Sequence, residues 1–280
     1  MQLFIEIIKT VLYGIVEGIT EWLPISSTGH LILLEEVLPL SVSEEFFEMF
    51  EVVIQLGASL AVLGLFIKTL LPSFREKDFF RCDTNKKTFT LWGKIIVAVI
   101  PSAVIGLLFD DWFDEHFYNA YVVAAMLALY GIIYIILETR KGRKEPTVES
   151  VHDISYGKAL GMGCFQVLAL IPGTSRSGST ILGGLMLGLS RGAASEMSFF
   201  LALPTMLGAS ALKALKFFLD GGALGVTEII ILLVGCAVSY IVSVIAIKFL
   251  LGFVKKHTFT AFGIYRVALA ALVALYFILK

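Results

Sequence analysis

Residues 17–30 read EGITEWLPISSTGH and place two carboxylates, four hydroxyls and an imidazole in a strongly apolar N-terminus. Glu17 and Glu21 are four residues apart, so they share one face of a helix, where two like charges repel each other. In a low-dielectric site one of them holds a proton unless a cation lies between them. Ionisable groups inside a membrane are costly and usually functional. The alternative is an interfacial helix with both carboxylates in water, since Trp22 is suited to an interface.

The hydroxyls of this stretch suggest covalent chemistry. Ser26, Ser27 and Thr28 follow Pro24, and His30 comes shortly after them. A hydroxyl nucleophile needs a nearby base, and a neutral imidazole is the usual one. Two alternatives stay open: Ser26 or Thr28 caps the next helix, and His30 makes only a packing hydrogen bond.

A second polar stretch, PGTSRSGST at residues 172–180, contains five hydroxyls, one guanidinium and two glycines. A helix predicted over 180–189 aims its N-terminal amides at this loop. These amides, the helix dipole and Arg176 together form a cradle for an oxyanion or a phosphate. The stretch lacks the Lys-Ser/Thr pair of a Walker A loop and the Gly-x-Ser-x-Gly pattern of a nucleophile elbow around Ser175. A Gly/Ser-packed helix pair is the alternative, but it leaves an unpaired arginine unexplained.

The two stretches are complementary, because one carries acid, base and nucleophile candidates and the other carries anion-binding groups. If they meet tip to tip, the site suits phosphoryl transfer from a substrate that lives in the membrane. Substrate charge beside Glu17 and Glu21 calls for a divalent cation with oxygen ligands, Mg²⁺ or Ca²⁺. Cys82, Cys164 and Cys236 form neither a disulfide framework nor a metal-binding spacing.

The composition of the chain indicates what kind of protein contains these two polar stretches. The chain is 58% hydrophobic and 16% charged, with a mean hydropathy of +0.88, whereas a soluble domain is about half apolar and about a quarter charged. Long apolar runs recur along the chain, so we expect an all-α polytopic membrane protein. A net charge of −1 gives no indication of a nucleic-acid partner. The N-terminus shows no cleavable signal.

The apolar runs predict six membrane spans and two broken segments. The spans lie over 49–71, 91–109, 121–137, 197–219, 228–250 and 259–279. The broken segments are 3–34, interrupted at Pro24 and Gly29, and 157–189, interrupted at Pro172, Gly173 and Gly178. Each reads as a re-entrant helix–loop–helix, whose irregular backbone must be buried in protein or line a wet cavity.

The loops between spans alternate in charge, and this predicts orientation. Basic loops carry Arg75, Lys77, Arg81, Lys86 and Lys87, then Arg140, Lys141, Arg143 and Lys144, then Lys255 and Lys256. Acidic segments carry Glu35, Glu36, Glu44, Glu45 and Glu48, then Asp110, Asp111, Asp114 and Glu115. The positive-inside tendency places the basic loops in the cytoplasm and both termini outside. Lys213 and Lys216 are exceptions, because they fall on the acidic side.

The two halves of the chain resemble each other. ISSTGH at 25–30 matches TSRSGS at 174–179 with an offset of 149, and QLGAS at 55–59 matches MLGAS at 206–210 with an offset of 151. Each half then holds a hairpin and three spans, so the second half enters from the opposite face. We expect one membrane domain over 1–280, an inverted-topology repeat of 1–140 and 150–280, with its site near the midplane. Chance similarity between Gly/Ser-rich segments is the alternative.

The two motifs EGITEWLPISSTGH and PGTSRSGST closely resemble the signature motifs of the bacterial undecaprenyl-diphosphate phosphatase family, the bacitracin-resistance proteins. The likeness in length, span pattern and motifs covers essentially the whole chain. It implies removal of the terminal phosphate of undecaprenyl diphosphate, which recycles the lipid carrier for cell-wall synthesis. It also implies bacitracin resistance, because the antibiotic sequesters the diphosphate. The implied location is the bacterial cytoplasmic (inner) membrane, with the active site opening outward.

The family motifs map onto this chain without departure. The Glu-rich motif corresponds to Glu17 and Glu21, the hydroxyl–His motif to 26–30 and the Arg loop to 173–180. We expect Ser27 to attack the terminal phosphorus and His30 to take its proton. Glu17 and Glu21 hold the metal, or Glu21 helps as base; water activated by Glu21 or His30 is the rival nucleophile. The expected phosphate-binding residues are Ser26, Thr28, Gly173, Thr174, Ser175, Arg176, Ser177, Ser179 and Thr180.

A lipid-phosphate transporter or flippase that uses the same Arg176 cradle is the second class of function, because inverted repeats with broken helices are typical of transporters. Phosphate release by purified protein separates the two classes.

Glycine-rich spans permit close helix packing and hence a homodimer. Arg266 lies within a predicted span and is either structural or a seal on the cytoplasmic side; the sequence leaves both readings open.

Overall fold

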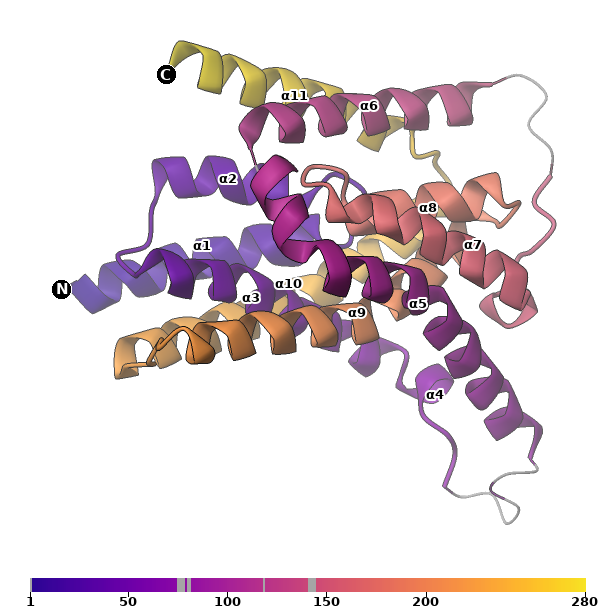
Figure 1. The fold of residues 1–280 in the computed structure, drawn as a ribbon. Helices are drawn as coiled ribbons and strands as arrows, with labels where there is room; N and C mark the ends of the chain where they lie inside the picture. Colours follow the sequence, from indigo (N-terminus) through magenta and orange to yellow (C-terminus); the bar gives the residue numbers. More distant parts are fainter. Residues whose placement is uncertain (1, 75–78, 80–81, 118, 141–144) are drawn as a thin grey trace.

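The computed structural model describes residues 2–74, 79, 82–117, 119–140 and 145–280, with the backbone alone at 110, 111 and 114. Within these ranges the chain is built from helices, and one isolated β-bridge joins Val148 to Leu189. Figure 1 shows most of the long helices running side by side along one direction, with α5 oblique to them and both termini at the same end of the molecule. The predicted all-α fold is confirmed.

Six helices of the described chain are long and apolar enough to cross a membrane. They are α3 (Glu44–Leu65), α5 (Asp83–Phe117), α6 (Ala120–Thr139), α9 (Arg191–Leu219), α10 (Val226–Val254) and α11 (Thr260–Leu279). The six predicted spans are thereby confirmed, but several begin earlier than the apolar run. Ser43 and Ser190 accept hydrogen bonds from first-turn amides of α3 and α9, so these helices start in polar sequence.

The first span needs a correction. The predicted span over 49–71 ends at Leu65, and the short helix α4 (Ile67–Leu70) follows it. Phe66 lies between the two helices with φ −110° and ψ 24°, and its ring packs edge-on against Phe200 at 5.1 Å between centroids. Hydropathy continues through this break, so an apolar run could not reveal it.

Two broken hairpins occupy the middle of the molecule, as predicted. The first consists of α1 (Gln2–Thr20) and α2 (Ser27–Val37). The second consists of α7 (Tyr156–Val167), the 3₁₀ turn η2 (Leu168–Leu170) and α8 (Arg176–Met186), and it follows the 3₁₀ turn η1 (Val151–Asp153). The first hairpin opens toward the end that carries the termini, and the second opens toward the opposite end (Figure 1).

Gly29 and Gly178 do not interrupt these hairpins, contrary to the prediction. Both lie in the first turn of a helix, and their amides donate to the cap residues Ser26 and Ser175. Helix α8 therefore starts at 176 rather than at 180. Lack of space explains why both positions hold glycine. A Cβ on Gly29 would lie 3.0 Å from a side chain of α6, and one on Gly178 would lie 3.1 Å from Ser175. The breaks themselves lie over 21–26 and 171–175.

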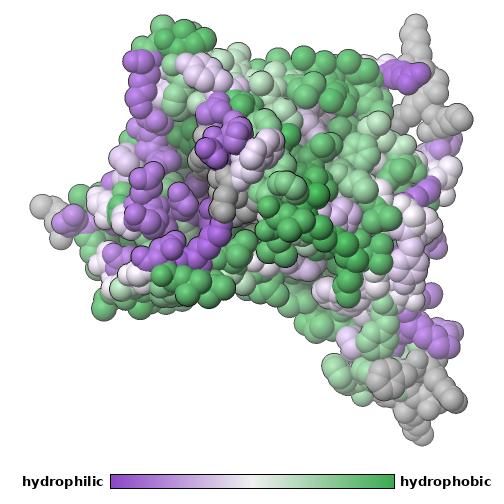
Figure 2. Space-filling model, viewed as in Figure 1, coloured by the Kyte–Doolittle hydropathy of each residue, from purple (hydrophilic) through white to green (hydrophobic). Residues whose placement is uncertain are grey.

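The hairpins pack within a cage of spans. Helix α1 lies along α10, α7 lies along α5, α6 lies along α11, and α3 packs against α9 and α10. Figure 2 shows hydrophobic residues across the middle of this face and hydrophilic ones toward its two ends. This distribution fits a protein whose middle lies in lipid. The inverted-topology repeat and its division at 140 and 150 stay predictions.

Several residues of the charge argument lie outside what the structure describes. They are Arg75, Lys77, Arg81, Lys141, Arg143 and Lys144, together with the side chains of Asp110, Asp111 and Asp114. The exception at Lys213 has a local explanation, because its Nζ lies 3.4 Å from Glu48 Oε2 in the acidic segment. Which end faces the cytoplasm stays a prediction.

Candidate active site

The tips of the two hairpins meet inside the protein. Arg176 Nη2 donates to Glu21 Oε1 at 2.7 Å, and Ser177 Oγ donates to the Leu23 carbonyl at 3.4 Å. The side chains of the ion pair are 7% and 5% exposed. Two motifs from opposite halves of the chain therefore share one interior site.

Glu21 also contacts the candidate nucleophile. Ser27 Oγ donates to Glu21 Oε2 at 3.1 Å, so one carboxylate lies between the hydroxyl and the guanidinium. Ser27 and Arg176 are each the first residue of a helix, and the serine before each has positive φ: +73° at Ser26 and +70° at Ser175. No other non-glycine residue in the described ranges has positive φ. Such backbone is strained by about 1–3 kcal/mol per residue and occurs where the surroundings enforce it.

Glu17 is fully buried, and neither of its carboxylate oxygens has a hydrogen-bond partner among the described residues. Four more polar atoms in the hairpins share this condition: Trp22 Nε1, Gln166 Oε1, Thr174 Oγ1 and Arg176 Nε. Buried polar groups are normally hydrogen-bonded, so a concentration of unpartnered atoms indicates a place that a ligand completes. The interfacial alternative for this helix is excluded, because Glu17, Glu21 and Trp22 are all buried.

The other side of Arg176 is held by residues that the motifs did not reveal. Its Nη1 donates to the Ser198 carbonyl at 2.6 Å, and its guanidinium carbon lies 5.7 Å from the centre of the Trp22 ring. Ser198 Oγ in turn lies 2.7 Å from Thr180 Oγ1. Ser198 is one serine in the apolar α9, and nothing in its local sequence distinguishes it from a packing residue.

Three further hydroxyls of the Arg loop make hydrogen bonds within α8 or to α7, whereas Thr174 Oγ1 has no partner among the described residues. Ser175 Oγ accepts from the Gly178 amide, Ser179 Oγ donates to the Phe165 carbonyl, and Thr180 Oγ1 donates to the Arg176 carbonyl. Ser26 is the cap of α2, as the alternative reading of that hydroxyl held, and Thr28 is half-buried beside it. Their predicted part in phosphate binding stays a prediction.

His30 is oriented by two partners. Its Nδ1 lies 2.7 Å from the Ser26 carbonyl oxygen, and its Nε2 lies 2.7 Å from the Tyr265 hydroxyl. A carbonyl can only accept, so Nδ1 carries the hydrogen and Nε2 accepts from Tyr265. The imidazole thus holds the carbonyl of a strained cap, while the carboxylate of Glu21 faces Ser27. Tyr265 gave no signal in the sequence, because a tyrosine within a predicted span resembles an ordinary packing residue.

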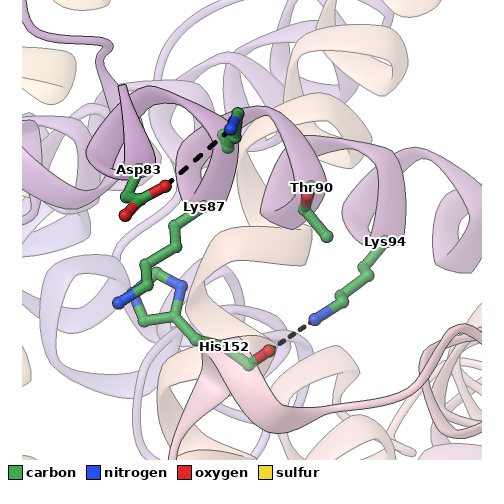
Figure 3. A pocket seen from close by; sticks show the side chains of 6 residues that line it. Asp83, Lys87, Thr90, Lys94 and His152 are labelled. Carbon is green, nitrogen blue, oxygen red and sulfur yellow. Dashed lines mark hydrogen bonds and ion pairs between the residues drawn. The ribbon is translucent and has the colours of Figure 1, made fainter. Parts of the chain in front are cut away.

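A cationic cavity of about 230 Å³ lies elsewhere, at the N-terminal end of α5 (Figure 3). Its lining residues are Asp83, Lys86, Lys87, Thr90, Lys94 and His152. Lys94 Nζ donates to the His152 carbonyl at 2.6 Å. Burial, followed by the charges of Lys87 and Lys94, lowers the pKa of His152. No residue of either hairpin motif lines this cavity, so it is separate from the hairpin site.

Comparison with known proteins adds the family. The family model described as bacitracin resistance protein BacA matches residues 10–272. The chain belongs to the BacA family. A curated relative, the undecaprenyl-diphosphatase of Enterococcus faecalis, is 53% identical over 97% of both chains. The undecaprenyl-diphosphatase of Acetivibrio thermocellus is 53% identical over 98% of both chains, and that of Streptococcus thermophilus is 50% identical over 98% of this chain and 94% of its own.

Proposed function

We propose that the two hairpin tips form the active site of an undecaprenyl-diphosphatase, which converts undecaprenyl diphosphate into undecaprenyl phosphate and inorganic phosphate. Membership of the BacA family and the full-length similarity to diphosphatases support this reaction. The observation that carries the site is Glu21, held between Ser27 Oγ at 3.1 Å and Arg176 Nη2 at 2.7 Å. The reaction recycles a lipid carrier of cell-wall synthesis and thereby confers bacitracin resistance.

Ser27 supplies the nucleophile and Glu21 supplies the base. Ser27 Oγ attacks the terminal phosphorus while Glu21 Oε2, to which it donates, takes its proton. The bond between the terminal phosphorus and the bridging oxygen breaks, and undecaprenyl phosphate leaves with that oxygen. Water then hydrolyses the phosphoserine and releases inorganic phosphate. His30 contributes indirectly, by holding the Ser26 carbonyl one residue before the nucleophile.

Arg176 offsets the charge of the transferring phosphoryl group. Its Nε has no partner among the described residues and is available to a phosphate oxygen. The first-turn amides of α2 and α8 lie at the same two tips, and helix N-termini favour anions. Preorganised donors in a buried site are the main source of transition-state stabilisation in phosphoryl transfer.

A divalent cation, Mg²⁺ or Ca²⁺, fits beside Glu17. Its two buried and unpartnered carboxylate oxygens are suitable hard ligands, with Glu21 four residues away on the same face. No three His, Cys, Asp or Glu side chains gather as a metal cluster in the described chain, so a cation held here would need substrate phosphate oxygens as further ligands, as is usual for Mg²⁺. A bound cation supplies further compensation for phosphate charge.

Two rivals are open to experiment. Water activated by Glu21 fits the same geometry without a phosphoserine. A lipid-phosphate transporter uses the site without chemistry; it is not favoured, because the relatives are named for a hydrolytic reaction.

We also propose that the site and both termini face the outside of the bacterial cytoplasmic membrane. The homodimer stays a prediction from the glycine-rich spans.

The test is phosphate release from undecaprenyl diphosphate by detergent-purified protein, with and without a chelator. We expect Arg176→Ala to lose about 3 kcal/mol or more of transition-state stabilisation, a fall of at least about 100-fold in kcat/KM. His30→Ala should lose less than Ser27→Ala, because the imidazole acts through the backbone. Absence of phosphate release by the wild type would establish a carrier and overturn the proposed function.

A further inference from the structure

Arg266 of α11 is fully buried, and its environment is unusual for a charged side chain. All five hydrogen bonds that its guanidinium makes to described residues go to backbone carbonyls. The ring of Tyr130 packs against it, with the guanidinium carbon 5.5 Å from the ring centre. A guanidinium suits such a place, because its N–H donors form a rigid fork and its charge persists at any physiological pH.

The carbonyls belong to both hairpin tips and to one span. Nη1 donates to Pro24 at 3.3 Å in the first tip, and Nη2 donates to Gly173 at 2.8 Å and Thr174 at 3.0 Å in the second. The span is α6, which accepts at Met126 from Nη2 at 3.3 Å and at Leu127 from Nε at 3.4 Å. One side chain therefore links three segments that lie far apart in the sequence.

The carbonyls in the tips lie two or three residues before the reactive residues. Pro24 precedes the strained cap Ser26 and hence Ser27, and Thr174 precedes the strained cap Ser175 and hence Arg176. Strained backbone of this kind persists only where other contacts enforce it. Arg266 binds the chain at the point where each strained turn begins, so it is placed to fix both turns at once.

The helix pair around Arg266 is built to bring it there. Gly131 of α6 and Gly263 of α11 cross so closely that a Cβ on either would lie 2.7 Å from the carbonyl oxygen of the other. Tyr134 of α6 donates to the Gly178 carbonyl in α8 at 2.7 Å. The α6–α11 pair thus holds the second hairpin through a tyrosine and both hairpins through Arg266.

We propose that Arg266 is a positioning residue of the phosphatase reaction: it aligns the two hairpin tips so that Ser27 and Glu21 face Arg176. This inference rests on the proposed active site at the tips. It decides between the two readings that the sequence left open, because the partners of Arg266 are the hairpin tips rather than a cytoplasmic loop.

The experiment compares Arg266→Lys with Arg191→Lys in the phosphate-release assay. Arg191 is a matched control, since it pairs with Glu138 through two bonds of 2.9 and 2.6 Å, away from the tips. Lysine keeps the charge but cannot span carbonyls on three segments. We expect Arg266→Lys to lower kcat at least about 10-fold with KM within about 3-fold, because misalignment of reacting groups affects the chemical step. Arg191→Lys should keep both constants within about 2-fold.

A double variant separates alignment from general destabilisation. Once Arg176→Lys has removed the guanidinium that Arg266 positions, adding Arg266→Lys should reduce kcat by less than about 3-fold, because residues that act as a unit are non-additive. Arg191→Lys should combine with Arg176→Lys multiplicatively. Full activity of a folded Arg266→Lys, or a multiplicative effect in the double variant, would overturn the proposal.

Folding is monitored by the thermal unfolding midpoint in detergent, and Arg266→Gln serves as a second variant. If neither variant folds while Arg191→Lys does, Arg266 is required for folding rather than for alignment, and the proposal is wrong. The proposed function fails separately, when the wild type releases no phosphate or when Ser27→Ala and Arg176→Ala keep full activity.

Discussion

Glu21 is the residue on which the chemistry converges, because it accepts from a hydroxyl of its own hairpin and from a guanidinium of the other. The two opposite charges lie 2.7 Å apart in the protein interior, and their attraction offsets part of the cost of burying them. The same pair explains why an arginine is tolerated at this depth. The Glu21 carboxylate, which is the acceptor, and the Arg176 guanidinium, which is the anion-binding group, are thus fixed relative to each other before substrate binds.

At this scale, Ser27→Ala is the direct test of covalent catalysis. We expect a fall of at least about 1,000-fold in kcat, as for other activated nucleophiles. Acid quenching during turnover of the wild type should trap phosphate on Ser27, detected by mass spectrometry. Ser59→Ala is the matched control, because Ser59 is equally buried and its hydroxyl only donates to Leu56 in α3. Full activity of Ser27→Ala would establish the water mechanism instead.

Glu17→Gln should separate stability from activity. A buried carboxylate without a partner destabilises the fold, so the neutral amide should raise the thermal unfolding midpoint, equivalent to about 1 kcal/mol or more. Phosphate release should fall about 100-fold and lose its sensitivity to chelator, because the cation ligand is gone. The measurements are thermal unfolding in detergent and the assay with and without EDTA. A lower midpoint with unchanged activity contradicts this role.

The residues of the site could be predicted from the sequence where a polar or charged residue stands in an apolar segment. Carboxylates, hydroxyls and an arginine in an apolar chain identified Glu17, Glu21, Ser27 and Arg176 as candidates before any contact was known. Ser198 and Tyr265 could not be found in this way, because they act through tertiary contacts and resemble ordinary packing residues. The side chain that faces Ser27 also depends on the backbone path of the turn over 21–26. The spacing of residues along the sequence does not determine that path.

At the scale of helices, hydropathy located the spans and both hairpins but not their ends. Serine caps determine where α2 and α8 begin, and they convert predicted helix breaks at Gly29 and Gly178 into first-turn positions. A hydropathy pattern is an average over about one helical turn or more, so it cannot locate the single capping residue at which a helix begins. The break at Phe66 was missed for the same reason.

Gly173 is the glycine at which backbone geometry is decisive. Its φ is +87°, and a Cβ would lie 2.6 Å from the Val123 carbonyl oxygen of α6. We expect Gly173→Ala to lower the unfolding midpoint and to reduce kcat at least about 10-fold, because the second tip must move away from α6.

Gly208→Ala is the control for this substitution. Gly208 lies in α9, and a Cβ there meets no atom within 4 Å. Alanine favours a helix over glycine by about 1 kcal/mol, so the control should keep its activity with equal or higher stability. Wild-type activity and stability in Gly173→Ala would show that the tip tolerates a displaced backbone.

At the scale of the whole molecule, the two hairpins open toward opposite ends and the termini share one end (Figure 1). The acidic segment of α2 and α3 lies at the end of the termini, where Lys280 also binds Glu36 at 2.6 Å. Charge alternation predicted that the termini and the acidic segments share one end, since loop charge biases orientation. The packing of α6 on α11, which brings Arg266 to the tips, carries no comparable signal.

Single cysteines test the orientation. In a chain with Cys82, Cys164 and Cys236 replaced, Lys280→Cys and Lys256→Cys report on opposite ends. We expect a membrane-impermeant maleimide to label position 280 in intact cells and position 256 only after permeabilisation, because basic loops stay in the cytoplasm. Phosphate release by both variants confirms that they are folded. The reverse labelling pattern would place the termini and the site opening inside.

The ion pair of the site joins two residues 155 positions apart. During synthesis the first hairpin therefore reaches the bilayer long before its guanidinium partner has been translated. In that interval Glu21 and Glu17 share an apolar surrounding with no compensating charge from the second hairpin, so the nascent chain holds two buried carboxylates in an unfinished state. Catalytic competence arises late in biogenesis, and a chain truncated before α8 inserts is inert.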